Sequence, residues 1–161
     1  MNMSTVLSLL NNAEYPAMPS QAPMRVVGAA RMRSTKNLRV LLVEDDDADV
    51  YLIRRALSQL PKVSEVRVAR DGVEALELIE SWSAGPDLAI VDLKMPRKDG
   101  FTLLREFAAR KEVNFPTVIL TSSKAGADVY RAKKRGAVEF VTKPNGLEKL
   151  KNVLSELVTK Y

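Results

Sequence analysis

From Asn37 onward, short apolar runs alternate with segments of helical periodicity, and this alternation constrains the fold more than any other feature. The predicted strands are Leu38–Val43, Glu65–Ala69, Leu88–Val91, Thr117–Leu120 and Ala137–Val141. The helices expected after them are Asp47–Gln59, Val73–Trp82, Phe101–Arg110, Gly126–Lys134 and Leu147–Lys160. The first, third and fourth strands read as continuous apolar runs, and strands of this kind separated by helices favour a parallel sheet covered on both faces. We therefore expect an α/β fold with a doubly wound five-stranded parallel sheet in the order 2-1-3-4-5.

Polar side chains follow four of these predicted strands directly. Glu44 and Asp45 follow the first strand, Asp92 the third, Thr121 the fourth, and Lys143 comes at the end of the fifth. The carboxyl ends of parallel strands meet at one edge of the sheet, where open α/β sheets place their sites. Carboxylates, a hydroxyl and an ammonium group at that edge suit a divalent cation and a phosphoryl group.

The acidic run after the first strand has two interpretations. An aspartate at the start of a helix often accepts backbone hydrogen bonds, which accounts for Asp46 or Asp47. It does not account for Glu44 and Asp45, which follow a buried strand. A third carboxylate beside them, Asp92, is repelled unless a cation lies among the three. We therefore expect these carboxylates to bind Mg²⁺ and Asp92 to act as a nucleophile toward a phosphoryl donor.

The hydroxyl and ammonium groups are less specific signals. Lysines are usually solvated, and a threonine often ends a strand without a further role. At this edge, however, Lys143 can pair with Asp92 or its phosphate, and the Thr121 hydroxyl can bond a phosphoryl oxygen. Asp99 and Gly100 are most simply a turn in which the glycine relaxes the backbone.

Together these residues resemble the receiver domain of two-component response regulators, over about Asn37 to Tyr161. The resemblance is carried by Glu44-Asp45, Asp92 with Met95-Pro96 and Asp99-Gly100, Thr121-Ser122, and Lys143-Pro144. It implies a flavodoxin-like receiver fold. It also implies that Asp92 accepts a phosphoryl group from a sensor histidine kinase or a histidine phosphotransfer protein.

The resemblance also assigns the other site residues. It implies Mg²⁺ as the cofactor, bound by Glu44, Asp45, Asp92 and the main-chain carbonyl of Lys94. It places Thr121 and Lys143 on the phosphoryl oxygens, with a cis peptide between Lys143 and Pro144. Thr121 and Phe140 are the implied switch residues. Many receivers have tyrosine at the second position, so phenylalanine removes a hydroxyl from the switch.

The predicted elements end at the chain terminus, and we expect a single-domain regulator that is not an enzyme beyond its own Mg²⁺-dependent phosphotransfer and dephosphorylation. It looks similar to regulators paired with phytochrome-type kinases or used as phosphorelay intermediates. The implied output surface is formed by Gly126–Lys134, Ala137–Val141 and Leu147–Lys160. Its downstream protein target is unknown, and a homodimer is an open alternative.

Two other functions remain as alternatives. The first is a receiver-like interaction module that never accepts phosphate. The second is a haloacid-dehalogenase-like phosphatase, whose Asp-x-Asp pair superficially fits Asp45–Asp47 or Asp47–Asp49. Mapping the phosphorylated residue separates a receiver, modified on Asp92, from the phosphatase, modified on Asp45 or Asp47.

Composition excludes several other classes of protein. The chain has no cysteine and no histidine, which removes disulfides, thiolate chemistry, histidine bases and the usual zinc ligands. No apolar run approaches the 18 or so residues of a membrane span, and we expect a cytoplasmic protein. The net charge of +5 is weak evidence for nucleic-acid binding, because much of it lies before Asn37. A basic group around Arg131–Arg135 is most simply a solvated helix face.

The first 36 residues differ from the rest in composition. They contain Pro16, Pro19 and Pro23, and we expect a disordered or loosely ordered arm with a short helix at Met3–Asn11. Two alternatives are a true start at Met24 or Met32 and an organelle transit peptide. Residues 37–161 are then the receiver domain.

Overall fold

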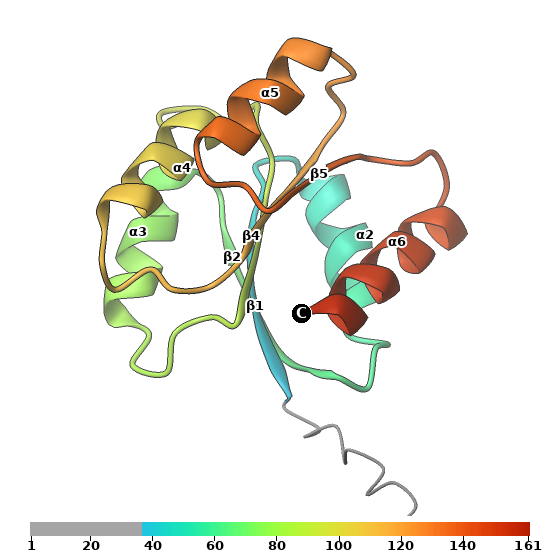
Figure 1. Ribbon diagram of the computed structural model, residues 1–161. Helices are drawn as coiled ribbons and strands as arrows, with labels where there is room; N and C mark the ends of the chain where they lie inside the picture. The colour runs from blue at the N-terminus through green and yellow to red at the C-terminus, as the bar shows by residue number, and fades with distance from the viewer. Residues whose placement is uncertain (1–36) are drawn as a thin grey trace, which may run out of the picture. The chain divides into compact units, whose positions relative to one another are not determined.

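The computed structural model describes residues 37–161, which form a five-stranded parallel sheet between two layers of helices (Figure 1). The expected arm and its helix at Met3–Asn11 lie outside these residues. The strand order is β2-β1-β3-β4-β5, which confirms the predicted fold. The strands are β1 (Leu38–Val43), β2 (Val63–Ala69), β3 (Leu88–Val91), β4 (Thr117–Thr121) and β5 (Glu139–Thr142). The helices are α2 (Asp47–Leu57), α3 (Gly72–Ser81), α4 (Gly100–Ala109), α5 (Gly126–Lys134) and α6 (Leu147–Lys160).

The core lies on both faces of the sheet. Helices α3, α4 and α5 cover one face, and α2 and α6 cover the other (Figure 1). Neighbouring residues of β1 point to opposite faces, so that Leu41 packs with the first layer and Leu42 with the second. This two-sided burial explains why β3, and β1 from Val40 onward, read as continuous apolar runs.

Strand pairing moves several boundaries away from those predicted. Strand β2 begins at Val63 because this residue pairs with Leu38 of β1. Thr121 and Thr142 are partners in the β4–β5 register, so both strands extend to these threonines. Ala137 lies outside β5, since its N–H donates to the carbonyl of Ala132 at 3.1 Å and closes the turn after α5.

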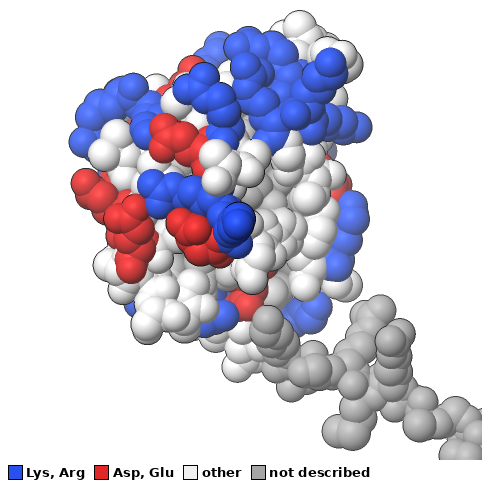
Figure 2. Space-filling model, turned by 60° about the vertical axis from the view of Figure 1, so that its left-hand side comes forward, with Lys and Arg blue, Asp and Glu red and all other residues white. Residues whose placement is uncertain are grey.

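Helix α5 is the least buried of the five described helices. Of its nine residues, only Ala132 is buried. The guanidinium groups of Arg131 and Arg135 lie 4.1 Å and 5.5 Å from the ring centroid of Phe101 in α4. Figure 2 shows lysine and arginine side chains gathered over α5, at the top of the view. Cation–π contacts to α4 therefore add to the small apolar burial that holds this helix.

Asp71 caps α3 and ties it to the loop that follows β3. Its Oδ1 accepts hydrogen bonds from the N–H groups of Val73 and Glu74 at 2.7 Å and 3.1 Å, and Arg97 pairs with its Oδ2. Burial alone raises the pKa of Asp71. The two backbone N–H groups and the guanidinium outweigh burial, so this pKa lies below its ordinary value.

We expect the Asp71→Ala substitution to lower the free energy of unfolding by about 2 kcal/mol at neutral pH, because it removes a helix cap and a charged partner. The folded pKa is depressed, so the stabilisation is present above the unfolded pKa and is lost as the pH falls through the folded value. Urea unfolding of wild type and variant at about pH 7 and about pH 3 measures this difference. Asp99→Ala, at an exposed cap with one hydrogen bond, is the control. An effect of Asp71→Ala that does not shrink in acid contradicts the assignment.

Candidate functional site

The polar residues predicted at the strand ends come together at one edge of the sheet. One carboxylate oxygen from each of Glu44, Asp45 and Asp92 lies within 4.8 Å of the others. The N–H of Asp92 donates to the carbonyl of Val43 at 2.9 Å, which extends the pairing of β1 with β3 beyond the strands. Glu44 and Asp92 are buried, whereas Asp45 is exposed. The geometry therefore contains the predicted cluster of three carboxylates.

Asp92 has one engaged and one unengaged carboxylate oxygen. Its Oδ2 accepts the N–H of Lys94 at 3.1 Å. Its Oδ1 is buried without a hydrogen-bond partner among the described residues. The Lys143 ammonium lies 3.7 Å from Oδ1, within ion-pair range but beyond a hydrogen bond. A buried carboxylate oxygen without a donor is unfavourable, so this edge fits a ligand that brings positive charge.

Lys143 is held by two other carboxylates. Its Nζ donates to Glu44 Oε2 at 2.6 Å and to Asp49 Oδ2 at 2.7 Å. The sequence analysis missed Asp49, which belongs to the first turn of α2. The contact could not be read from the sequence, because it joins the first turn of α2 to the residue after β5, 94 positions away.

The electrostatics of the cluster follow from burial and from its excess of negative charge. Burial raises the pKa of Glu44 to about 7, Lys143 opposes this rise, and Asp92 adds to it. Burial lowers the pKa of Lys143, but hydrogen bonds to Asp49 and Glu44 outweigh burial and raise it above its ordinary value. The Lys143 ammonium therefore keeps its positive charge. This single charge does not balance the several carboxylates around it. Oxygen donors of this kind suit a hard divalent cation.

The predicted switch residues lie on β4 and β5. Thr121 is buried, and its Oγ1 is 3.4 Å from the N–H of Ser123. Phe140 is partly buried and packs with the cluster beneath α3, α4 and α5. The prediction of a cis peptide between Lys143 and Pro144 was wrong, because residues 37–161 contain no cis peptide bond. The trans form is the one that X–Pro bonds generally favour.

Gly100 has a different role from the one predicted. Asp99 is the N-cap of α4, with Oδ1 accepting the N–H of Thr102 at 2.7 Å, and Gly100 is the first residue of that helix. A Cβ at Gly100 would lie 2.3 Å from the carbonyl oxygen of Asp92 and 3.0 Å from the Cα of Leu93. The glycine is therefore needed for the close approach of α4 to the end of β3, not to relax a turn.

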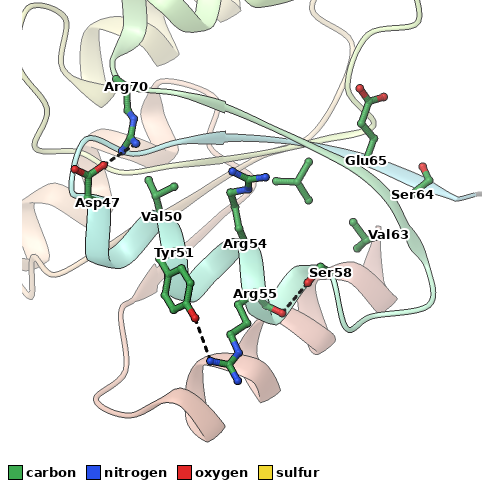
Figure 3. Close-up of a pocket in the computed structure, with 11 residues that line it drawn as sticks. Asp47, Val50, Tyr51, Arg54, Arg55, Ser58, Val63, Ser64, Glu65 and Arg70 are labelled. Atoms are coloured by element: carbon green, nitrogen blue, oxygen red, sulfur yellow. Dashed lines mark hydrogen bonds and ion pairs between the residues drawn. The ribbon is translucent and has the colours of Figure 1, made fainter.

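A separate groove of about 740 Å³ lies between α2 and the edge strand β2 (Figure 3). Along it, Arg70 pairs with Asp47 at 2.6 Å, and Arg55 donates to the hydroxyl of Tyr51 at 3.2 Å. None of the predicted site residues lines this groove. The groove is therefore separate from the carboxylate cluster at the strand ends.

Comparison with known proteins agrees with this geometry. Residues 40–155 match the family model described as the response regulator receiver domain. The chain is 37% identical over 123 residues to protein-glutamate methylesterase/protein-glutamine glutaminase 6 of Anaeromyxobacter dehalogenans, covering 75% of this chain and 34% of that protein. It thus spans about a third of the length of the methylesterases that it matches. In the described part of the chain, no helix is long and apolar enough to cross a membrane.

Solved structures show the same fold. The phosphorylated cyanobacterial phytochrome response regulator RcpA superposes with a TM-score of 0.70 at 29% identity, over 75% of this chain and 91% of that one. The Mn²⁺-bound form of response regulator Rcp1 superposes with a TM-score of 0.66 at 27% identity, over 74% and 91%. One relative is therefore phosphorylated and another binds a divalent cation.

Proposed function

This chain belongs to the response regulator receiver domain family, and we propose that it accepts a phosphoryl group on Asp92 as part of two-component signalling. The observation that carries the proposal is the state of Asp92. Its buried Oδ1 has no donor among the described residues, and it lies beside the Glu44 carboxylate and the Lys143 ammonium. An unengaged carboxylate oxygen near a fixed positive charge is suited to attack phosphorus.

The proposed transfer uses a histidine kinase or a histidine phosphotransfer protein as donor. The Oδ1 of Asp92 forms a bond to phosphorus while the phosphorus–nitrogen bond of the donor's phosphohistidine breaks and its electron pair stays on the imidazole. Lys143 balances the negative charge of the phosphoryl oxygens, and the Thr121 hydroxyl bonds one of them. The Lys94 N–H keeps Oδ2 oriented, which leaves Oδ1 for attack. The family pattern and the contacts of Asp92 with Lys94 and Lys143 support these roles.

We propose Mg²⁺ as the cofactor, bound by Glu44, Asp45, Asp92 and the main-chain carbonyl of Lys94. Receiver domains bind Mg²⁺ at an acidic pocket, and the three neighbouring carboxylates here fit a divalent cation. A Mn²⁺-bound relative supports the same assignment. When bound, the cation neutralises charge on the transferring group.

The double change Glu44→Gln and Asp45→Asn is expected to abolish phosphorylation, because it removes two of the three carboxylates that hold the cation. Wild type incubated with acetyl phosphate and Mg²⁺ should gain the mass of one phosphoryl group, and the double variant should gain none. Asp46→Asn with Asp47→Asn is the matched control, with the same charge loss in the same acidic run. Undiminished phosphorylation of wild type after Mg²⁺ is chelated would refute the metal role.

We further propose that phosphorylation is read out on the surface formed by α5, β5 and α6. Helix α5 buries only Ala132 among its residues, so it can shift without breaking a large apolar core. Thr121 and Phe140 lie on the two strands next to it and couple the phosphoryl site to that surface. The proposed downstream target is a protein that binds this surface differently in the phosphorylated and the unphosphorylated states.

Mass analysis of the phosphorylated protein also separates the alternatives. A receiver-like module that binds partners without phosphorylation gains no mass from acetyl phosphate. A haloacid-dehalogenase-like phosphatase carries the group on Asp45 or Asp47. The proposed regulator carries it on Asp92.

A further inference from the structure

Lys143 makes its shortest contacts with carboxylates other than the proposed phosphoacceptor. Its ammonium is 2.6 Å from Glu44 and 2.7 Å from Asp49, but 3.7 Å from Oδ1 of Asp92. Its side chain is only 12% exposed, which restricts where the ammonium can move. Lys143 is therefore engaged beside Asp92 without donating a hydrogen bond to it.

The position of Asp49 is fixed by its helix. Its N–H donates to Oδ1 of Asp46, the N-cap of α2, at 2.9 Å. The next turns of α2 are anchored by the buried side chains of Val50 and Ile53. The Asp49 carboxylate is thus presented to Lys143 by a capped and packed helix, while its side chain remains 36% exposed.

We propose that Asp49 is a positioning residue that holds the Lys143 ammonium away from Asp92 and competes for it with a phosphoryl group on Asp92. This inference rests on the proposed function. A phosphoryl group on Oδ1 would bring a more highly charged acceptor close to Nζ, whose hydrogen bonds now go to Glu44 and Asp49, so pairing with the phosphoryl oxygens competes with these two short bonds. Glu44 is one of the proposed Mg²⁺ ligands, so at saturating Mg²⁺ the contact with Asp49 is the one that remains to compete with the phosphoryl group.

The proposed competition predicts in which direction the loss of Asp49 changes the stability of the phosphorylated state. The bond between Asp49 and Lys143 stabilises the unmodified protein and not the phosphorylated one. Removing the Asp49 carboxylate should therefore favour the phosphorylated state. A purely structural contact joining α2 to the end of β5 would instead change only the stability of the fold.

The test uses Asp49→Asn, with Asp47→Asn as the matched control. Both substitutions remove one carboxylate from the first turn of α2, but Asp47 pairs with Arg70 and does not contact Lys143. The first readout is the NMR signal of the Lys143 ammonium in the unmodified, Mg²⁺-free protein. The second is affinity for beryllium fluoride, a phosphoryl mimic, at saturating Mg²⁺.

Asp49→Asn is expected to shift the Lys143 ammonium signal and speed its hydrogen exchange. It should also bind beryllium fluoride about fivefold more tightly than wild type, a modest factor because Asp49 is partly solvent-screened. Asp47→Asn should stay within about twofold of wild type. Asp49→Glu, which keeps the carboxylate, should restore both readouts toward wild type.

The outcomes separate this inference from the proposed function. If wild type itself fails to bind beryllium fluoride, the proposed function is wrong and this inference falls with it. If wild type binds and Asp49→Asn binds no more tightly than Asp47→Asn, only the inference is overturned. A lower melting temperature for Asp49→Asn with unchanged affinity also overturns it and identifies a structural contact.

Discussion

An Asp92→Asn variant is expected to gain no phosphoryl mass from acetyl phosphate and Mg²⁺, under conditions in which wild type is modified. The substitution replaces the nucleophilic carboxylate oxygen with an amide of nearly the same shape, which cannot form a stable acyl phosphate. The loss should be complete, because the proposed transfer has no other acceptor. Intact-protein mass spectrometry measures the gain, and a thermal melt close to that of wild type shows that the variant is folded.

Asp99→Asn is the matched control for this result. It lies in the same connection between β3 and α4, and asparagine is as good an N-cap as aspartate. This variant should gain the same mass as wild type. A normal mass gain in Asp92→Asn would place the phosphoryl group elsewhere and would overturn the proposed function.

Gly100→Ala is expected to lower the free energy of unfolding by about 3 kcal/mol, at the upper end of the usual cost of overpacking. The added Cβ would lie 2.3 Å from the carbonyl oxygen of Asp92 and 3.0 Å from the Cα of Leu93. Both atoms belong to the backbone at the end of a buried strand, so they cannot turn aside as a flexible side chain would. Any movement that relieves the clash also displaces Asp92, so phosphorylation should slow as well.

Gly126→Ala provides the comparison, since Gly126 is likewise the first residue of a helix, α5. A Cβ there meets no atom within 4 Å, so alanine should leave stability unchanged or raise it by about 0.5 kcal/mol. Urea unfolding of the two variants measures the difference. Equal stability of both variants would show that the approach of α4 to the end of β3 is not tight.

The sequence alone determined the architecture and the meeting of the three carboxylates. Strands buried on both faces leave a continuous apolar pattern, which is why β1 and β3 have the predicted bounds. A parallel topology then brings the residues after those strands to one edge, whatever the packing details. The sequence alone therefore predicts that Glu44, Asp45 and Asp92 lie together, as they do in the structure. Their roles in catalysis and metal binding stay predictions.

The edge strands and the contacts around the site were decided by tertiary structure. Strands β2 and β5 are only partly buried, so their bounds depend on hydrogen bonds to β1 and β4 and not on an apolar pattern. The ion pair of Lys143 with Asp49 joins residues 94 positions apart, and the tight approach at Gly100 joins a helix start to a strand end. Both depend on where helices dock on the sheet to within about an ångström, and a local sequence pattern carries no information on that scale.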